Sequence, residues 1–161
     1  MADSRTAPEQ IAAVLAEAQE WTGTPYVSCA KVKGHGADCL TFIAGVFENA
    51  GLIEPVDLAP YPPDWHLHRD EERYLTGVIG YCQEVEGDPQ PGDIVLWRFG
   101  RVYSHGALVI AWPRIIHAMV RQPCREDDAM ANQGLAYIGE RGFDCGKPRP
   151  RKTFRFKGWV A

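Results

Sequence analysis

The chain has 161 residues, of which 45% are apolar and 24% charged, a composition typical of a folded globular protein and unlike a disordered or fibrous one. Its length supports a single domain over 1–161. The formal net charge of −4 lacks the positive excess of a general nucleic-acid binder. No apolar run approaches the roughly 18 residues of a membrane span, so we expect no nucleic-acid partner and no membrane span.

The N-terminus and the cysteines indicate the compartment. The first residues, "MADSRTAPEQ", are polar and acidic, whereas an export signal needs a basic start and an apolar stretch, so we expect the chain to be cytoplasmic at synthesis. Five cysteines, at positions 29, 39, 82, 124 and 145, have no paired spacing and are expected to be free thiols. The basic run "KPRPRKTFRFK" is interpreted as a solvated terminal segment, with contact to an acidic partner as the alternative.

Two helices are predicted in the N-terminal third. The first opens with Thr6 and Glu9 at capping-box spacing and closes at Gly23. A glycine-containing loop follows over 24–37. The second helix has Asp38 as its N-cap and ends before position 51. Its apolar stripe puts a thiol in the first turn, facing the fold, and comprises Cys39, Phe42, Ile43, Val46, Phe47 and Ala50.

The rest of the chain is predicted to hold an insertion and then strands. Residues 55–82 begin rich in proline and turn helical from about Asp70 to Cys82. Three antiparallel strands are predicted in "PGDIVLWRFG" and "SHGALVIAWPRIIHAMV". Residues 121–146 are expected to be loop with some helix, and the alternation in "TFRFKGWV" predicts a last edge strand.

A cysteine at a helix start can be a nucleophile if a histidine takes its proton and a further acceptor orients that ring. The positive helix end is expected to lower the pKa of the Cys39 thiol. His105 and His117 bracket the predicted hairpin, and both rings can face the same side. A simple turn near Pro113 would pair His117 with about Val109, about 13 Å along the strand from His105. Contact between the rings therefore requires a bulge, twist or stagger.

A metal site is the competing interpretation of these side chains. Cys29, His35 and Cys39 are spaced C-x5-H-x3-C, and His66 and His68 form H-x-H. Structural zinc sites usually take four ligands from two close pairs, and no C-x2-C pair is present. We therefore expect no metal and no other cofactor. The two histidines of the insertion are interpreted as exposed, with a place in the wall of a cleft as the alternative.

Three separated blocks of sequence carry a resemblance to a known family. They are "GTPYVSCAKVKGHGADCLTFIAGVFENAGL", "PGDIVLWRFGRVYSHGALVI" and "IIHAMV", within about residues 8–120. In this order they resemble the NlpC-type bacterial cell-wall cysteine peptidases, relatives of papain in fold. The resemblance implies an α+β, papain-like fold, with N-terminal helices and the nucleophile at a helix start packed on an antiparallel sheet. It also implies hydrolysis of amide bonds in peptidoglycan stem peptides, in the family commonly the bond between D-glutamate and a diamino acid.

The resemblance assigns a role to each matching residue. Cys39 would be the nucleophile, His105 the general base and acid, and His117 the residue that orients His105. Tyr26 would flank the nucleophile and help to bind the substrate or its oxyanion. Asp38 would help to recognise a free amine on the substrate. Backbone N–H groups at the start of the second helix would receive the oxyanion, and water would release the acyl-enzyme.

The chain departs from the family pattern around the cysteine. Leu40 and Thr41 stand where the family usually has Ser-Gly, and residues 28–30, Ser-Cys-Ala, replace an aromatic residue and paired glycines. The short chain, the insertion and the closing "RKTFRFKGW" resemble phage and prophage peptidases encoded near tail genes. This implies phage tail proteins as partners and transport to the cell wall with a phage particle. A noncatalytic tail or wall-binding subunit, and an acyltransferase or amidase with the same triad, are the alternatives.

Overall fold

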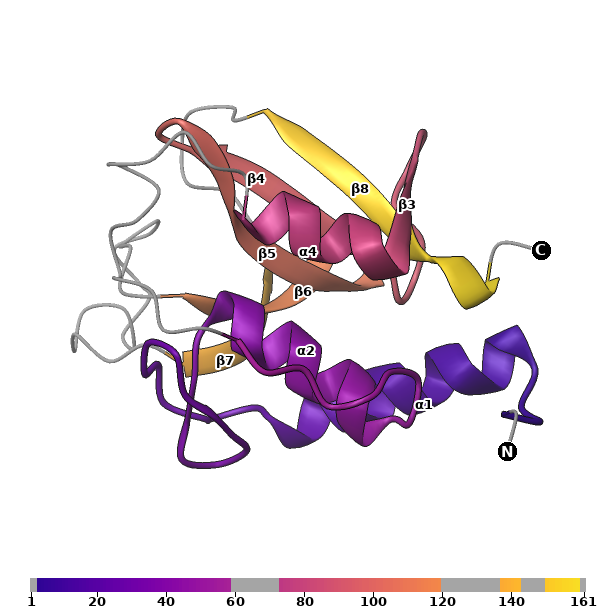
Figure 1. Ribbon diagram of the computed structural model, residues 1–161, viewed down its shortest axis with the longest axis horizontal. Coiled ribbons are helices and arrows are strands. Elements are labelled where there is room, and N and C mark those ends of the chain that lie inside the picture. Colours follow the sequence, from indigo (N-terminus) through magenta and orange to yellow (C-terminus); the bar gives the residue numbers. More distant parts are fainter. Residues whose placement is uncertain (1–2, 59–72, 120–136, 143–149, 160–161) are drawn as a thin grey trace.

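The computed structural model describes residues 3–58, 73–119, 137–142 and 150–159. Two helices at the N-terminal end, α1 (Ala7–Glu20) and α2 (Cys39–Asn49), lie below the large sheet in Figure 1. Between them runs a two-stranded ladder of β1 (Lys31–Val32) and β2 (Gly36–Ala37), inside the segment predicted to be loop. The helix α4 (Arg73–Tyr81) lies in front of the sheet in Figure 1, above α2.

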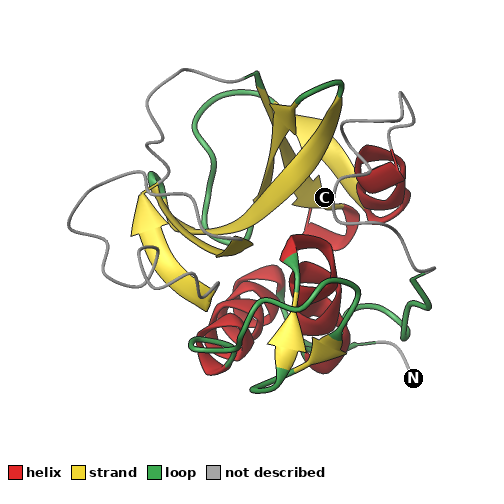
Figure 2. Cartoon of the chain, turned by 90° about the vertical axis from the view of Figure 1, so that its left-hand side faces the viewer, coloured by secondary structure: helices red, strands yellow, loops and turns green. Residues whose placement is uncertain are grey.

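A six-stranded antiparallel sheet forms the other half of the fold. Figure 2 shows its long strands above α1 and α2, with the short β1–β2 ladder at the bottom of the view. A 3-10 turn (Lys157–Trp159) follows the last strand. The strands, in spatial order, are β3 (Cys82–Val85), β8 (Arg151–Phe156), β4 (Ile94–Phe99), β5 (Val102–Ala111), β6 (Arg114–Met119) and β7 (Tyr137–Gly142).

The sheet confirms three predicted strands and corrects three other expectations. The strands β4, β5 and β6 fall in the predicted segments. The predicted edge strand, β8, instead pairs with β3 on one side and β4 on the other. The strand β7 lies in a segment expected to be loop with some helix. The helix α4 ends at Tyr81, and Cys82, predicted to be the end of this helix, begins a strand. The predicted start of the helix near Asp70 lies outside the described residues.

Local sequence signals account for the two N-terminal helices. The Glu9 carboxylate accepts hydrogen bonds from the Thr6 N–H at 2.7 Å and the Thr6 hydroxyl at 2.8 Å, which confirms the predicted capping box. A side chain at Gly45 would meet the Trp21 ring, so the glycine allows α1 and α2 to approach closely. The predicted stripe of α2 is buried at Phe42, Ile43, Val46, Phe47 and Ala50.

Strand alternation places apolar side chains on both faces of the sheet. Leu96, Leu108 and Ile116 pack with the helices in the main cluster. Trp97 and Ile115 belong to a second cluster on the other face. No helix within the described ranges is long and apolar enough to cross a lipid bilayer. The single domain expected over 1–161 stays a prediction.

Candidate active site

The start of α2 is fixed by a buried carboxylate. Asp38 is 1% exposed, and its Oδ1 accepts hydrogen bonds from the N–H groups of Leu40 at 3.0 Å and Thr41 at 2.9 Å. Its Oδ2 accepts a bond from the N–H of Cys29 at 2.8 Å, a residue with a φ of 63°. Asp38 is thus an N-cap that also ties the preceding loop to the helix. Contact of this carboxylate with a substrate amine stays a prediction.

The Cys39 thiol is directed from α2 toward β5. It is partly buried, and its Sγ donates to the Ser104 carbonyl at 3.5 Å. Burial and the Asp38 carboxylate raise the pKa of the thiol to about 12, although backbone N–H groups, including that of Gly106, act in the opposite direction. The prediction that the helix start lowers this pKa is therefore wrong. Burial raises the pKa by more than the backbone N–H groups lower it. Cys39 is a neutral thiol near neutral pH.

The hairpin of β5 and β6 brings the two histidines together. A register shift lies between Val109 and Ala111, and Val109 pairs with Ile115. Continuing this register sets His117 opposite the second residue after His105, a diagonal pair whose side chains can meet. His105 Nε2 lies 2.9 Å from His117 Nδ1, within hydrogen-bond distance. The register of a simple turn, with His117 opposite about Val109, is not formed, and a bulge of the kind that ring contact was expected to require lies in this hairpin.

His105 lies in an aromatic environment. It is 7% exposed, and the Trp97 ring stacks on it with 5.8 Å between centroids. The Phe99 ring meets it edge-on at 5.8 Å. Burial and the nearby His117 hold the pKa of His105 well below its ordinary value of 6.5. The imidazole is therefore neutral at neutral pH and can accept a proton.

Tyr26 lies beside the start of α2. Its neighbours fix it there, because Val27 donates its N–H to the Ala37 carbonyl at 3.0 Å and Ala37 donates to the Pro25 carbonyl at 3.1 Å. Burial raises the pKa of Tyr26, and negative charge at Cys39, when that thiol is ionised, or at Asp38 raises it further. The phenol consequently keeps its proton and can donate a hydrogen bond near the thiol.

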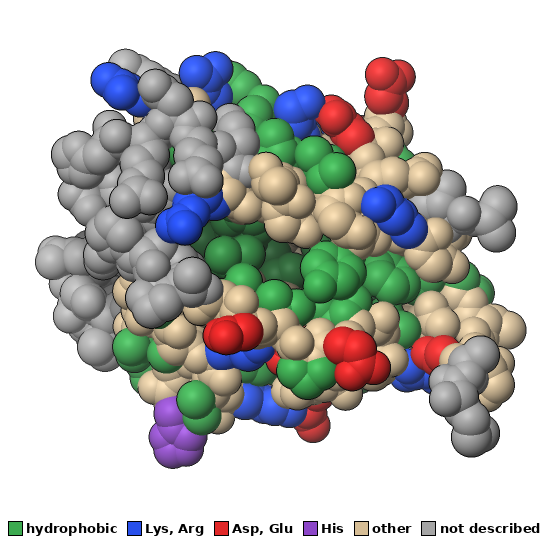
Figure 3. Space-filling view, viewed as in Figure 1, with side chains coloured by type: hydrophobic (Ala, Val, Ile, Leu, Met, Phe, Trp, Pro, Cys, Tyr) green, Lys and Arg blue, Asp and Glu red, His purple; other side chains and the backbone are tan. Residues whose placement is uncertain are grey.

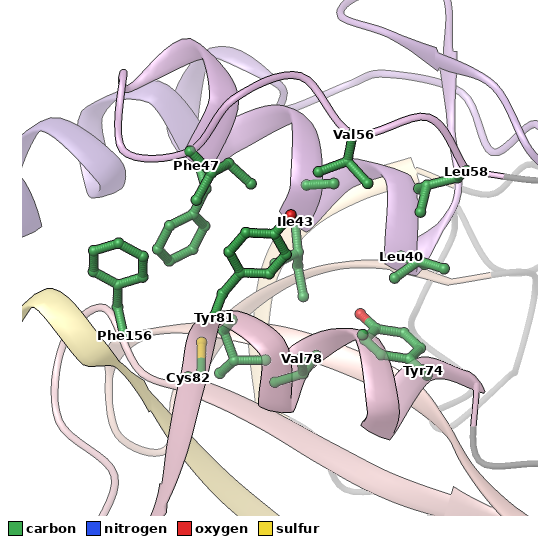
Figure 4. Close-up of a pocket in the computed structure, with 14 residues that line it drawn as sticks. Leu40, Ile43, Phe47, Val56, Leu58, Tyr74, Val78, Tyr81, Cys82 and Phe156 are labelled. Atoms are coloured by element: carbon green, nitrogen blue, oxygen red, sulfur yellow. The ribbon is translucent and has the colours of Figure 1, made fainter.

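A groove between α2 and α4 extends to Leu40, the residue after Cys39. It encloses about 90 Å³ and is lined almost entirely by apolar side chains, among them Leu40, Phe47 and Val78. Figure 3 shows this hollow between the two helices, and Figure 4 shows its walls. At its Leu40 end, the Tyr74 hydroxyl donates to the Cys39 carbonyl at 2.8 Å.

The sequence did not identify the residues that surround Cys39 and His105. Tyr74, Trp97 and Phe99 all contact either Cys39 or His105. Helical spacing on α4 and alternation along β4 can predict that these side chains are buried. Neither pattern predicts that they contact Cys39 or His105.

The other cysteines and histidines were candidates for a metal site. Across the described ranges, no group of three or more His, Cys, Asp or Glu side chains could hold a metal ion, and this covers Cys29, His35 and Cys39. Cys29, Cys39 and Cys82 are free thiols, while positions 124 and 145 lie outside the described residues. The insertion residues His66 and His68 also lie outside them.

Comparisons with known proteins identify the fold. No protein-family model matches this sequence, and no curated protein matches it. The NlpC/p60 domain of the peptidoglycan hydrolase SagA is 19% identical with a TM-score of 0.54, over 88% of this chain and 96% of that one. NlpC1 from Trichomonas vaginalis is 16% identical with a TM-score of 0.58, over 96% of this chain and 46% of that one. The peptidoglycan hydrolase RipB from Mycobacterium tuberculosis is 14% identical with a TM-score of 0.53, over 96% of this chain and 68% of that one.

At these identities the likeness shows the fold. The helices before the antiparallel sheet, with Cys39 at a helix start, are the α+β architecture that the sequence predicts. The chain has the papain-like fold of the NlpC/P60 peptidoglycan hydrolases.

Proposed function

We propose that this chain is a cysteine peptidase of the NlpC/P60 family that hydrolyses amide bonds in peptidoglycan stem peptides. The observation that carries the proposal is the 2.9 Å contact between His105 Nε2 and His117 Nδ1 on the hairpin. The Cys39 thiol donates a hydrogen bond to the backbone carbonyl of Ser104, the residue directly before His105 in the same strand. The peptidoglycan hydrolases SagA and RipB, which share the fold, support the substrate class.

The ring contact sets the direction of proton transfer. Because His105 Nε2 faces His117, the nitrogen that takes the thiol proton is Nδ1. Nε2–H then donates to His117 Nδ1, which requires a neutral His117 with its proton on Nε2. With both the thiol and the imidazole neutral at rest, proton transfer accompanies the attack of sulfur on the carbonyl carbon.

The helix start supplies the other half of the chemistry. Backbone N–H groups of Cys39, Leu40 and Gly106 already act on the sulfur, so the same corner can stabilise an oxyanion. Tyr26 adds a protonated hydroxyl there. His105 returns its proton to the leaving amine, and water activated by His105 releases the acyl group from Cys39.

The test is cleavage of isolated peptidoglycan and soluble stem peptides by the wild type and by Cys39→Ala. We expect new amines from the wild type alone, and the masses of the products identify the scissile bond. Competing amines in the assay reveal an acyltransferase, because they appear in the products. Lack of cleavage by folded wild type on both substrates would contradict the proposal.

A noncatalytic tail or wall-binding subunit is the second candidate, and the high pKa of the buried Cys39 thiol favours it. For such a subunit we expect the wild type and Cys39→Ala to bind peptidoglycan equally well, and neither to release amines.

We further propose that the chain is phage- or prophage-associated, made in the cytoplasm and carried to the wall with a particle. The insertion and the closing "RKTFRFKGW" support this subgroup. Mass spectrometry of purified particles from an induced lysogen of the source strain should detect the chain in tails. Finding it only in the cell fraction would contradict this proposal.

A further inference from the structure

Tyr74 links the insertion to the start of α2. It is 1% exposed, and its hydroxyl donates to the Cys39 carbonyl at 2.8 Å although the two residues are 35 positions apart. Figure 4 shows Tyr74 rising from α4 with its hydroxyl turned toward Leu40 and α2. The carbonyl it binds belongs to the first turn of the helix, the turn that carries the thiol.

The same side chain lies against the strand of His105. A side-chain carbon at Gly106 would collide with both the hydroxyl and the ring of Tyr74. The N–H of Gly106 is one of the groups that act on the Cys39 sulfur, and Gly106 follows His105 directly. Tyr74 is therefore wedged at the junction between the cysteine turn and the histidine strand.

From this junction we infer that Tyr74 is a positioning residue: its hydroxyl holds the first turn of α2 at the distance from β5 at which Cys39 and His105 can exchange a proton. The inference rests on the proposed function. Proton transfer and attack depend steeply on distance, so a small drift of the helix start lowers the rate of reaction while substrate binding is retained. The ring of Tyr74 fills space beside Gly106, and its hydroxyl supplies the hydrogen bond to the start of α2.

Tyr74→Phe isolates the hydroxyl because the phenyl ring keeps the packing. The matched control is Tyr81→Phe, a tyrosine on the same helix that lines the same groove and is 43% exposed. The first readout is the rate at which iodoacetamide alkylates Cys39, measured by peptide mass in the wild-type and His105→Gln backgrounds. The second is the kinetics of stem-peptide cleavage.

We expect Tyr74→Phe to lower both the alkylation rate and kcat by about tenfold, with KM changed less than about twofold. In the His105→Gln background, Tyr74→Phe should change alkylation by less than about twofold, because the distance it controls no longer matters. Tyr81→Phe should resemble the wild type. Gly106→Ala, which displaces the Tyr74 hydroxyl together with its ring, should reproduce the loss.

The outcomes separate this inference from the proposed function. If His105→Gln leaves the alkylation rate unchanged, the proposed pairing of Cys39 with His105 fails, and the inference with it. If His105→Gln slows alkylation but Tyr74→Phe does not, only the role of Tyr74 is overturned. An equal effect of Tyr74→Phe in both backgrounds would show a general loss of structure, and it too would overturn the role. Should Tyr74→Phe fail to fold, Gly106→Ala decides by the same comparison.

Discussion

The cysteine side and the histidine side of the site differ sharply in polarity. At the start of α2, the Asp38 carboxylate accepts hydrogen bonds from three backbone N–H groups and the Thr41 hydroxyl. His105, by contrast, packs against Trp97 and Phe99, and its Nε2 lies within hydrogen-bond distance of His117 Nδ1. The polar side carries the Asp38 charge, which opposes a second negative charge on Cys39, while burial on the aromatic side keeps the imidazole neutral and able to take a proton. Charge is thus disfavoured at rest on both reacting groups and forms during the reaction.

The largest expected effect comes from removing the base on the aromatic side. His105→Gln keeps an N–H donor for His117 but has no group that can take the thiol proton. We expect kcat for stem-peptide cleavage to fall by about 10³-fold, because the neutral Cys39 thiol then has no proton acceptor. Single-turnover assays on stem peptides measure it. A loss below tenfold would mean that another group serves as the base.

A pair of substitutions at His117 tests the orienting contact. His117→Leu removes the acceptor at Nδ1 from a buried site and with it the contact that orients the His105 ring, so we expect kcat to fall by about 10²-fold. His117→Asn retains an acceptor near the position of Nδ1, and its loss should stay within about tenfold. Equal losses in the two variants would indicate that His117 serves packing and does not orient the ring.

The polar side is tested by Asp38→Asn. The amide presents a donor to the Cys29 N–H in place of an acceptor. We therefore expect the free energy of unfolding to fall by about 2 kcal/mol. Loss of the negative charge should also lower the pKa of Cys39, and alkylation of Cys39 should become faster near pH 9. Urea unfolding and alkylation rates measure the two effects.

Asp93→Asn is the control for this change. Asp93 is 1% exposed and pairs with Arg155 at 2.8 Å, so its amide variant should also lose stability. It should leave the alkylation of Cys39 unchanged, because Asp93 is not among the groups that shift this thiol. A similar rise in both variants would trace the faster alkylation to loosened structure and not to charge.

The cysteine side could be predicted from sequence because its contacts are local. Asp38 binds residues two and three positions ahead, and the stripe of α2 follows from helical spacing. The sign of the net pKa shift at Cys39 could not be predicted, since a helix-end rule contains no information on burial.

The histidine side could be predicted only in outline. The order of Cys39, His105 and His117 agrees with the family pattern, but contact between the rings depends on the bulge after Val109, which alternation does not locate. The contact of Tyr74 with Cys39 depends on how α4 packs, since 35 positions separate the two. Long-range packing, and not local propensity, decides both.

The smallest expected effect is on stability in mild acid, and it again concerns the aromatic side. The folded protein holds the pKa of His105 well below 6.5, whereas the unfolded chain takes up a proton near that value. Below pH 6.5 the unfolded state therefore binds the extra proton, and the free energy of unfolding falls as pH falls, by about 1 kcal/mol between pH 7 and 5.5 for this group. Urea unfolding at these two pH values should show a smaller difference in His105→Gln than in the wild type. The carboxylates with lowered pKa values, Asp3, Glu9 and Glu17, bind protons mainly below this window and so contribute little to the difference. If the free energy of unfolding depends equally on pH in both proteins, burial on the aromatic side does not keep His105 neutral. The contrast between the two sides of the site would then lose its electrostatic basis.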